Sequence, residues 1–180
     1  MADPISPLPL AGGVGGGPVS LTDVAASDTP SPSPSREREG DILRFRDDEV
    51  HDEPAVTLDA FLEGQTNATA VRLEAGDDAR ALLPHLGQLG LVEVSFPSFR
   101  DGRGYSAARV LREAGYAGEL RAAGDVLVDQ VPLMRRCGFD SFAPEAPIDP
   151  AVLRRSLDRY KHHYQPAADA AVPVWKLRHG

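Results

Sequence analysis

Short apolar runs alternate with helix-like patterns along the chain from residue 70 onward. The runs "AVRLEA", "GLVEVSF", "GELRAAG" and "FDSFAP" have the length and composition of strands, and each precedes a stretch with helical spacing of apolar residues. Such an alternation is typical of a parallel sheet covered by helices. We therefore predict an α/β fold with a small parallel sheet of about four βα units, forming either an open sheet or half of a barrel.

Residues that begin or interrupt helices add detail to this pattern. Asp78 and Asp125 can cap the helices that follow two of the strands, and Asp149 stands before a proline that suits a first helical turn. Pro84 and Pro132 fall inside two predicted helices, where each removes a backbone hydrogen bond. We therefore expect a kink at both prolines.

The last predicted helix, "DPAVLRRSLDRYKHHY", carries an apolar stripe. Leu153, Leu157, Tyr160 and Tyr164 follow one another at spacings of four, three and four residues. This spacing places all four on one helical face. We predict that the stripe packs into the core.

The region before residue 70 divides into two parts. Residues 1–40 are rich in Pro, Gly and Ser and lack an apolar pattern that could bury surface, so a disordered tail is predicted. Residues 41–180 are predicted to form a single α/β domain. Early in this domain, "ILRF" predicts a short strand and "VTLDAFLEG" a short helix.

Charge and composition exclude several classes of function. The net charge of −8 opposes general binding to nucleic acids or to anionic membranes. No apolar run reaches the roughly 20 residues of a membrane-spanning helix, and the first residues do not resemble a signal peptide. With a single cysteine, the chain can form neither an internal disulfide nor an iron–sulfur cluster of its own. We therefore expect a soluble cytoplasmic protein, and we interpret the unspaced acidic run "DDEVHDE" as a solvated loop without a metal.

The loops that follow the strands are the expected place for a ligand. Right-handed crossovers bring every strand-to-helix loop to the carboxyl edge of a parallel sheet, where such sheets bind ligands. The loop "PSFRDGRG" (residues 97–104) is the longest of these loops. It holds Arg100, Asp101 and Arg103 immediately before a predicted helix, whose first N–H groups attract an anion.

This loop has a functional and a structural interpretation. An oxyanion such as sulfite, sulfate or phosphate could bind between the Arg103 guanidinium and the start of the helix, near Tyr105 and Ser106. Gly102 and Gly104 would let the main chain approach such a ligand closely. In the structural interpretation, the loop aspartate caps the helix or pairs with an arginine and thereby fixes the turn. Both interpretations stay open at this point.

Two charged residues lie inside predicted strands, Glu93 in "LVEVSF" and Arg121 in "ELRAAG". A buried charge without a partner costs several kcal/mol, so both side chains are expected to be paired. Glu93 and Arg121 could pair with each other. Alternatively, Arg121 could pair with Asp125 or Asp101. The structural interpretation is a buried ion pair, and the functional one makes Arg121 a second ligand for an anion at Arg103.

The segment "GRGYSA" (residues 102–107) also fits the pattern G-x-G-x-x-A of dinucleotide-binding folds. Asp125 follows about 20 residues later, at the end of the next predicted strand, as this pattern requires. However, five residues separate Phe96 from Gly102, whereas the fingerprint turn follows its strand directly. A nicotinamide or flavin nucleotide at Gly102, Gly104 and Asp125 is therefore an alternative ligand.

Cys137 follows two arginines, Arg135 and Arg136, whose charges would lower the pKa of a nearby thiol. It also ends a predicted helix, where the helix dipole disfavours a thiolate. We therefore predict that Cys137 is a small core residue.

The segments "FPSFRDGRGYS", "GELRAAGDVLVDQ" and "RCGFD" occur in this order along the chain. In this block the chain resembles the bacterial domain-of-unknown-function family 934, and the resemblance extends from about Asp41 to the last residue. The long tail before it and Pro132 depart from the family pattern. The family pattern falls on Phe96, Pro97, Phe99, Asp101, Gly102, Arg103, Gly104, Tyr105, Ser106, Gly118, Glu119, Leu120, Arg121, Gly124, Asp125, Asp129, Gln130, Arg136, Cys137, Gly138, Phe139 and Asp140.

The resemblance implies a functional context. Members of this family are usually encoded beside assimilatory sulfite reductase and are described as oxidoreductases of sulfite reduction, with no catalytic residue assigned. Sulfite reduction needs several electrons, and this chain cannot hold a cluster to carry them. We therefore expect an accessory protein that binds a sulfur oxyanion or the reductase at the carboxyl edge. Two alternatives are an oxidoreductase with a bound nucleotide and a structural scaffold or homodimer without catalysis. The candidate ligand-binding residues are Arg103, Arg121, Asp101, Asp125, Gly102, Gly104, Tyr105 and Ser106, followed by Arg100, Glu93, Asp129, Gln130, Arg136 and Cys137.

Overall fold

A computed structural model describes residues 42–51, 53–64, 67–169 and 171–177 of the chain. The predicted disordered tail, residues 1–40, lies outside the described residues. Within the described ranges, no helix is long and apolar enough to cross a membrane.

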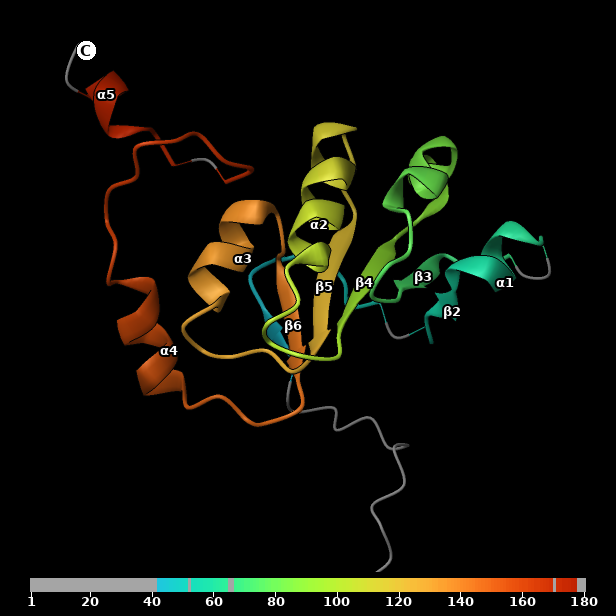
Figure 1. Cartoon of the computed structure of the whole chain (residues 1–180), viewed down its shortest axis with the longest axis horizontal. Helices are drawn as coiled ribbons and strands as arrows, with labels where there is room; N and C mark the ends of the chain where they lie inside the picture. Colours follow the sequence, from blue (N-terminus) through green and yellow to red (C-terminus); the bar gives the residue numbers. More distant parts are fainter. Residues whose placement is uncertain (1–41, 52, 65–66, 170, 178–180) are drawn as a thin grey trace, which may run out of the picture. The chain divides into compact units, whose positions relative to one another are not determined.

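One open sheet organises the described residues (Figure 1). Its strands lie in the order β1-β6-β5-β4-β3-β2. The strands from β2 to β6 run parallel, each beside its neighbour in the chain, whereas β1 pairs antiparallel with β6. The predicted α/β fold with a parallel sheet is therefore confirmed. The strands are β1 (Leu43–Arg44), β2 (Val56–Thr57), β3 (Ala70–Leu73), β4 (Leu91–Phe96), β5 (Glu119–Gly124) and β6 (Ser141–Pro144).

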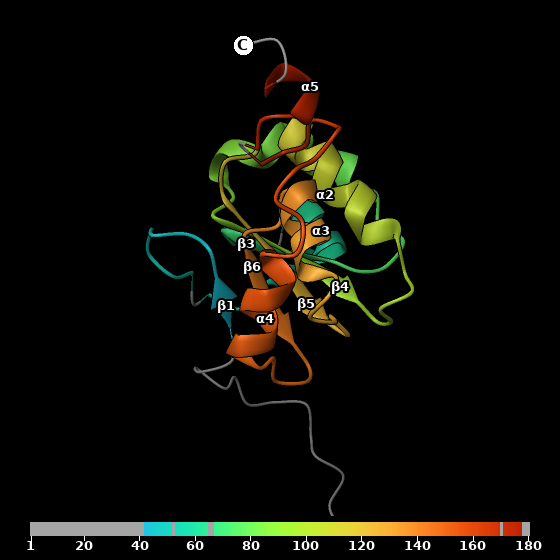
Figure 2. The ribbon, with the colours of Figure 1, turned by 90° about the vertical axis from the view of Figure 1, so that its left-hand side faces the viewer.

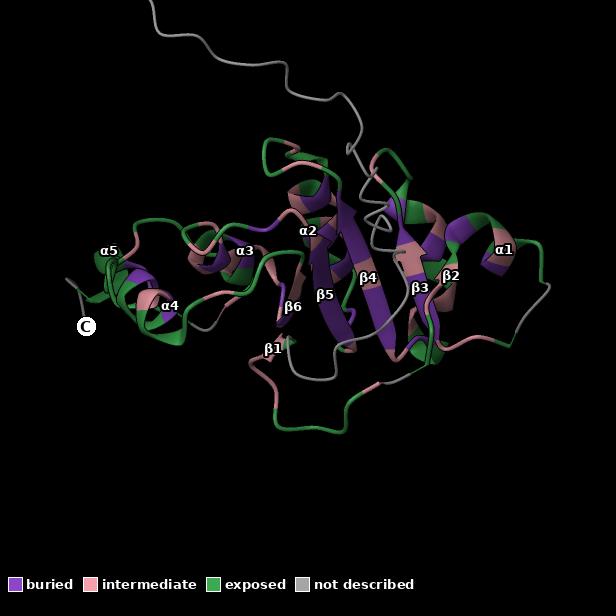
Figure 3. Cartoon of the chain, turned by 90° about the horizontal axis from the view of Figure 1, so that it is seen from below, coloured by how far each residue is buried: buried purple, intermediate pink, exposed green. Residues whose placement is uncertain are grey.

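The order of the strands places the helices on one side of the sheet. Because the parallel strands lie in chain order, every right-handed crossover returns on the same side. Figure 3 shows α2 and α3 on one side, and the chain between β1 and β2 on the other. We call these two sides of the sheet the helix face and the open face. The helices are α1 (Leu58–Leu62), the 3-10 helix η1 (Ala79–Gln88), α2 (Arg103–Glu113), α3 (Val131–Cys137), α4 (Pro150–Leu157) and α5 (Val174–Leu177).

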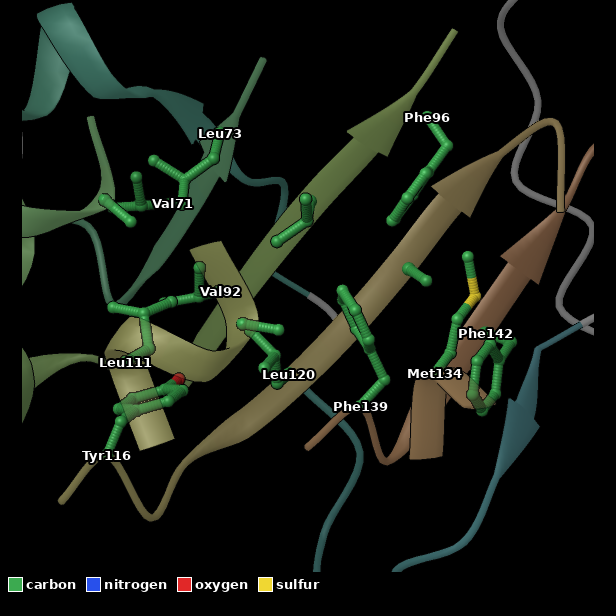
Figure 4. Packing of buried hydrophobic residues seen from close by; sticks show 14 of the residues in the cluster. Val71, Leu73, Val92, Phe96, Leu111, Tyr116, Leu120, Met134, Phe139 and Phe142 are labelled. Atoms are coloured by element: carbon green, nitrogen blue, oxygen red, sulfur yellow. The ribbon is translucent and has the colours of Figure 1, made fainter. Parts of the chain in front are cut away.

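The hydrophobic core fills the space between the helix face and the helices (Figure 4). On β4, Val92, Val94 and Phe96 belong to this core, and the residues between them point to the open face. The Phe96 ring meets the Phe139 ring edge to face, with centroids 5.8 Å apart. Leu111 of α2 is fully buried against the same cluster. The period-two pattern of the strands thus determines which residues meet the helices.

Two of the predicted helix caps are confirmed. The carboxylates of Asp78 and Asp149 accept backbone N–H groups of the first turns of η1 and α4, at 3.0 and 2.7 Å. The predicted cap at Asp125 is wrong, because α3 begins only at Val131. The intervening residues form a turn, and the Asp125 carboxylate binds a different loop, described below.

The two prolines do not kink α-helices as predicted. Pro132 is the second residue of α3, where its missing N–H has no helical acceptor and needs no kink. Pro84 lies inside η1, which winds as a 3-10 helix. Because Pro84 cannot donate an α-helical hydrogen bond, it disfavours α-helical winding in this segment.

The predicted apolar stripe at the end of the chain is only half correct. Leu153 is buried and Leu157 packs against the core. Tyr160 and Tyr164 are 67% and 75% exposed, because α4 ends at Leu157 and no helix continues the spacing. The two tyrosines therefore lie outside the core.

Candidate functional site

The candidate site lies at the carboxyl edge, where the loop between β4 and α2 meets the turn after β5. Residues 97–102 form this loop, which is two residues shorter than the predicted 97–104 because α2 already begins at Arg103. Gly124 ends β5 with a φ of 107°, and a Cβ there would come within 2.4 Å of the Phe96 carbonyl oxygen. Only glycine therefore allows the ends of β4 and β5 to approach this closely.

The helix start is already occupied by a carboxylate of the protein. Asp101 accepts the backbone N–H of Arg103 at 3.0 Å, and the same carboxylate receives the Arg103 guanidinium at 2.5 Å. The hydrogen bonds from Arg103 hold the pKa of Asp101 at about 2. An external oxyanion at this guanidinium would therefore have to compete with Asp101. The structural interpretation of this loop, an aspartate that caps and pairs, describes its geometry.

Asp125 and Gln130 brace the same loop from the neighbouring turn. The Asp125 carboxylate accepts the N–H of Phe99 at 2.9 Å, and the Gln130 amide donates to the Phe99 carbonyl at 2.7 Å. Gln130 also accepts the N–H of Leu127 at 3.3 Å. Both backbone groups of Phe99 are thus held by side chains more than 25 residues away. We call this arrangement the Phe99 brace.

The brace presents apolar side chains to solvent. Phe99 and Leu127 are each 38% exposed although their backbones are held in place. The Arg100 guanidinium lies over the Phe99 ring, 5.3 Å from its centroid. The carboxyl edge therefore offers an aromatic ring and a cation on a fixed loop.

The two glycines of the dinucleotide-like segment have structural explanations. Gly104 is buried in the first turn of α2, where a Cβ would lie 2.5 Å from the Phe96 ring and 3.0 Å from Val94. Its missing side chain lets α2 pack closely on β4. Gly102 has an ordinary φ of −85° and open space around it, so the predicted backbone freedom is not used. Asp125, the acidic residue of that pattern, is engaged in the brace.

The remaining edge candidates lie along α2 and α3. The Tyr105 ring packs on Phe96, 5.7 Å between centroids, whereas Ser106 is exposed. Burial raises the pKa of the half-buried Cys137 thiol more than Arg109 and Arg136 lower it, so the thiol form is favoured. This result fits a partly buried packing residue more than a nucleophile.

The lower-ranked candidates Asp129 and Arg136 are not part of the brace. Asp129 is exposed beside Gln130. Arg136 turns away from the edge and binds Asp169 at 3.0 Å and the Gln165 carbonyl at 2.7 Å. Both residues line a cavity that is described further below.

A row of mostly charged residues crosses the open face in register. Arg72 pairs with Glu93, Glu93 with Arg121, Arg121 with Ser141, and Ser141 with Arg44 along the Cα ladder. The Glu93 carboxylate lies 3.6 Å from the Arg72 guanidinium and 3.9 Å from that of Arg121. The predicted pairing of Glu93 with Arg121 is therefore confirmed. We call these five residues the open-face row.

Glu119 of β5 connects Arg121, in the middle of the open-face row, with Arg44 at its end. One carboxylate oxygen accepts from Arg121 at 2.8 Å, and the other accepts from Arg44 at 2.9 Å. The Glu119 side chain has no exposed surface. Burial alone would raise its pKa, but its hydrogen-bonded partners outweigh that effect and lower the pKa. Glu119 was not a predicted candidate, although its position two residues before Arg121 in one strand would place both on the same face.

The two arginines proposed for one anion site lie on different sides of the sheet. Arg121 belongs to the open face, whereas Arg103 begins α2 on the helix side, with its guanidinium close to Gly76. Among the described residues, neither Asp101 nor Asp125 contacts Arg121. A shared site for these arginines is therefore not formed.

In the described ranges, no group of three or more His, Cys, Asp or Glu residues could hold a metal ion.

One of the comparisons with known proteins gives a match. Neither a curated protein nor a solved structure matches the chain. The model of one family, described as "Bacterial protein of unknown function (DUF934)", matches residues 70–175, which include the Phe99 brace and most of the open-face row. The chain therefore belongs to the bacterial family DUF934.

Proposed function

We propose that this chain is an accessory protein of assimilatory sulfite reduction that binds the reductase through its carboxyl edge. The Phe99 brace is the observation that carries the proposal, and the reductase is the partner implied by the family resemblance. In this role the chain works in the cytoplasm and carries no electrons itself.

The fixed backbone of Phe99 favours protein binding. Both backbone groups of this residue are hydrogen-bonded, yet its ring is 38% exposed with Arg100 above it. Aromatic residues and arginine dominate the binding energy of protein interfaces. A loop that is ordered before binding also avoids the entropy cost of becoming ordered in the complex. The brace thus supplies both an anchor and its preorganisation.

A sulfur oxyanion is the less favoured ligand at this edge. The Arg103 guanidinium is bound to Asp101, and Arg121 lies on the open face. If an oxyanion nevertheless bound at Arg103, removing the competing carboxylate in Asp101→Asn would strengthen it. We expect sulfite, sulfate and phosphate to leave the thermal stability of both the wild-type chain and this variant unchanged.

Binding to purified assimilatory sulfite reductase tests the proposal. We expect Phe99→Ala to weaken binding about tenfold or more, as for an aromatic anchor that becomes buried in the complex. Leu83→Ala is the matched control, because Leu83 of η1 is equally exposed at 38% and lies outside the loop. Its affinity should stay within about twofold of the wild type. The proposal fails if the wild-type chain does not bind the reductase, or if both variants bind equally well.

A further inference from the structure

A cavity of about 810 Å³ is lined by residues of α3 and α4 and by Arg112 of α2, and none of the residues of the Phe99 brace lines it. It is bounded by α3, α4, the chain after α4 and the residues that follow β1. Figure 2 shows the chain after α4 running past α3, and Arg136 of α3 holds that segment through Asp169. Cavities of roughly 300–1,000 Å³ accommodate small organic ligands.

The floor of this cavity is fixed by internal hydrogen bonds. Arg46 and Arg112 each donate to the Asp140 carboxylate at 2.7 Å. Arg112 also donates to the carbonyl oxygens of Tyr116 and Gly138, at 2.6 and 2.9 Å. The charges of these two arginines are therefore used within the protein.

The rim carries positive charge that the protein does not neutralise. The cavity is lined by five arginines and three aspartates, although the whole chain has a net charge of −8. Within the described part of the chain, Arg135 and Arg159 have no carboxylate partner, against one unpaired lining carboxylate, Asp129. A cavity that keeps excess positive charge on an acidic protein favours an anionic ligand.

The wall of the cavity adds an apolar, flat component. The Arg135 guanidinium is stacked over the Phe45 ring, 4.1 Å from its centroid, which orients the cation. Pro132, Leu133, Phe139, Leu157 and Ala168 add to the apolar lining. A guanidinium held in this way can bind an oxyanion with two parallel hydrogen bonds, while the neighbouring wall accepts a flat apolar group.

We infer that this cavity binds a small organic anion in which an oxyanion group is attached to a flat apolar body. Arg135 and Arg159 are its cationic ligands. The inference uses none of the residues of the Phe99 brace and does not depend on the proposed role in sulfite reduction. An acidic peptide is the competing ligand, but a cavity of this volume suits a small molecule better.

Titration calorimetry of the full chain with phenyl phosphate tests the site. We expect phenyl phosphate to bind at least about tenfold more tightly than inorganic phosphate or phenol, because each of these offers only half of the interactions. The double variant Arg135→Gln/Arg159→Gln should lose about tenfold or more of this affinity.

The matched control is Arg154→Gln/Arg155→Gln. These two α4 arginines are exposed, have no ion pair within the described residues and do not line the cavity. This control removes the same charge and should retain affinity within about twofold. The inference is overturned if phenyl phosphate does not bind, if inorganic phosphate binds equally well, or if both double variants lose the same affinity. Tighter, Arg135-dependent binding of an oligoglutamate peptide would overturn it in favour of a protein partner.

Discussion

The two faces of β5 differ sharply in chemistry. Leu120 and Ala122 belong to the apolar core on the helix face, whereas Glu119 and Arg121 form ion pairs on the open face. Parallel strands covered by helices on both sides normally read as continuous apolar runs. The alternation of charged and apolar residues in "ELRA" instead reflects that helices cover only one side of this sheet.

The two faces of the sheet also differ in how strictly they fix the register of its strands. Apolar contacts on the helix face tolerate small rearrangements, because they are not directional. The open-face row requires a particular register, since slipping β5 by one residue would turn Glu119 and Arg121 toward the core. We interpret the row as a determinant of register more than as a source of net stability, because ion pairs of this kind must repay their desolvation.

The largest expected effects come from removing one residue of each face in turn. Glu119→Ala should lower the free energy of unfolding by about 3–5 kcal/mol, because it leaves two arginines without their shared carboxylate. Leu120→Ala should cost about 2–5 kcal/mol through the cavity it creates. Urea unfolding measures both values. Glu113→Ala is the control, because Glu113 is exposed and, among the described residues, pairs with Arg109 alone; it should change stability by at most about 0.5 kcal/mol. A loss below 1 kcal/mol for Glu119→Ala would contradict our description of the open face.

Low pH should remove part of the stability that Glu119 contributes. The folded-state pKa of Glu119 is lowered, so its stabilising effect is present above its unfolded pKa and is lost as the pH falls through the folded pKa. We therefore expect the stability gap between the wild type and Glu119→Gln to be larger at pH 7 than at about pH 3. Leu120→Ala has no titrating group, and its gap should not follow this trend. Chemical unfolding at both pH values makes the comparison.

A smaller loss is expected where α2 touches β4. Gly104→Ala places a methyl group 2.5 Å from the Phe96 ring, and overpacking of this kind costs about 1–3 kcal/mol. Gly102→Ala is the neighbouring control, since no atom lies within 4 Å of its Cβ position. Thermal unfolding of both variants separates packing from loop conformation. If the two variants had equal melting temperatures, close packing against Phe96 would not explain why residue 104 is a glycine.

The smallest effect is expected at the outer end of the open-face row. The Arg72 side chain is 42% exposed and pairs with Glu74 at 2.8 Å and with Glu93 at 3.6 Å. Arg72→Ala should therefore cost only about 0–1 kcal/mol in urea unfolding, and the cost should shrink in high salt. A loss as large as that of Glu119→Ala would mean that the whole row acts as one cooperative network.

Local signals in the sequence predicted most of the elements and the parallel sheet, but not the placement of the helices on one side of it. The alternation of strands and helices and the caps at Asp78 and Asp149 depend on neighbouring residues, and the structure confirms them. The one-sided placement of the helices depends on the order of the strands, which no local pattern specifies. The short strand β2 (Val56–Thr57), which adds a fifth βα unit, was instead predicted as the start of the helix "VTLDAFLEG", because two residues are too few to give a strand pattern.

The position of the candidate loop at the carboxyl edge was predicted from the sequence, but most of its contacts were not. The longest edge loop and its Arg103 and Asp101 were identified, and their pairing was one of the two interpretations. The partner of Asp125 could not be foreseen, because Phe99 lies 26 residues earlier and the contact forms only when β4 and β5 are adjacent. The contact between Arg44 and Glu119 likewise requires β1 to join the sheet beside β6.

The edges of the sheet have a consequence for association between copies. In the described part of the chain, both outermost strands, β1 and β2, consist of two residues each. Such short borders expose few free backbone groups, so a foreign strand finds little template for adding itself to the sheet. A growing intermolecular ribbon is therefore disfavoured at both ends, and self-association of this protein would have to use side-chain surfaces instead of shared backbone hydrogen bonds.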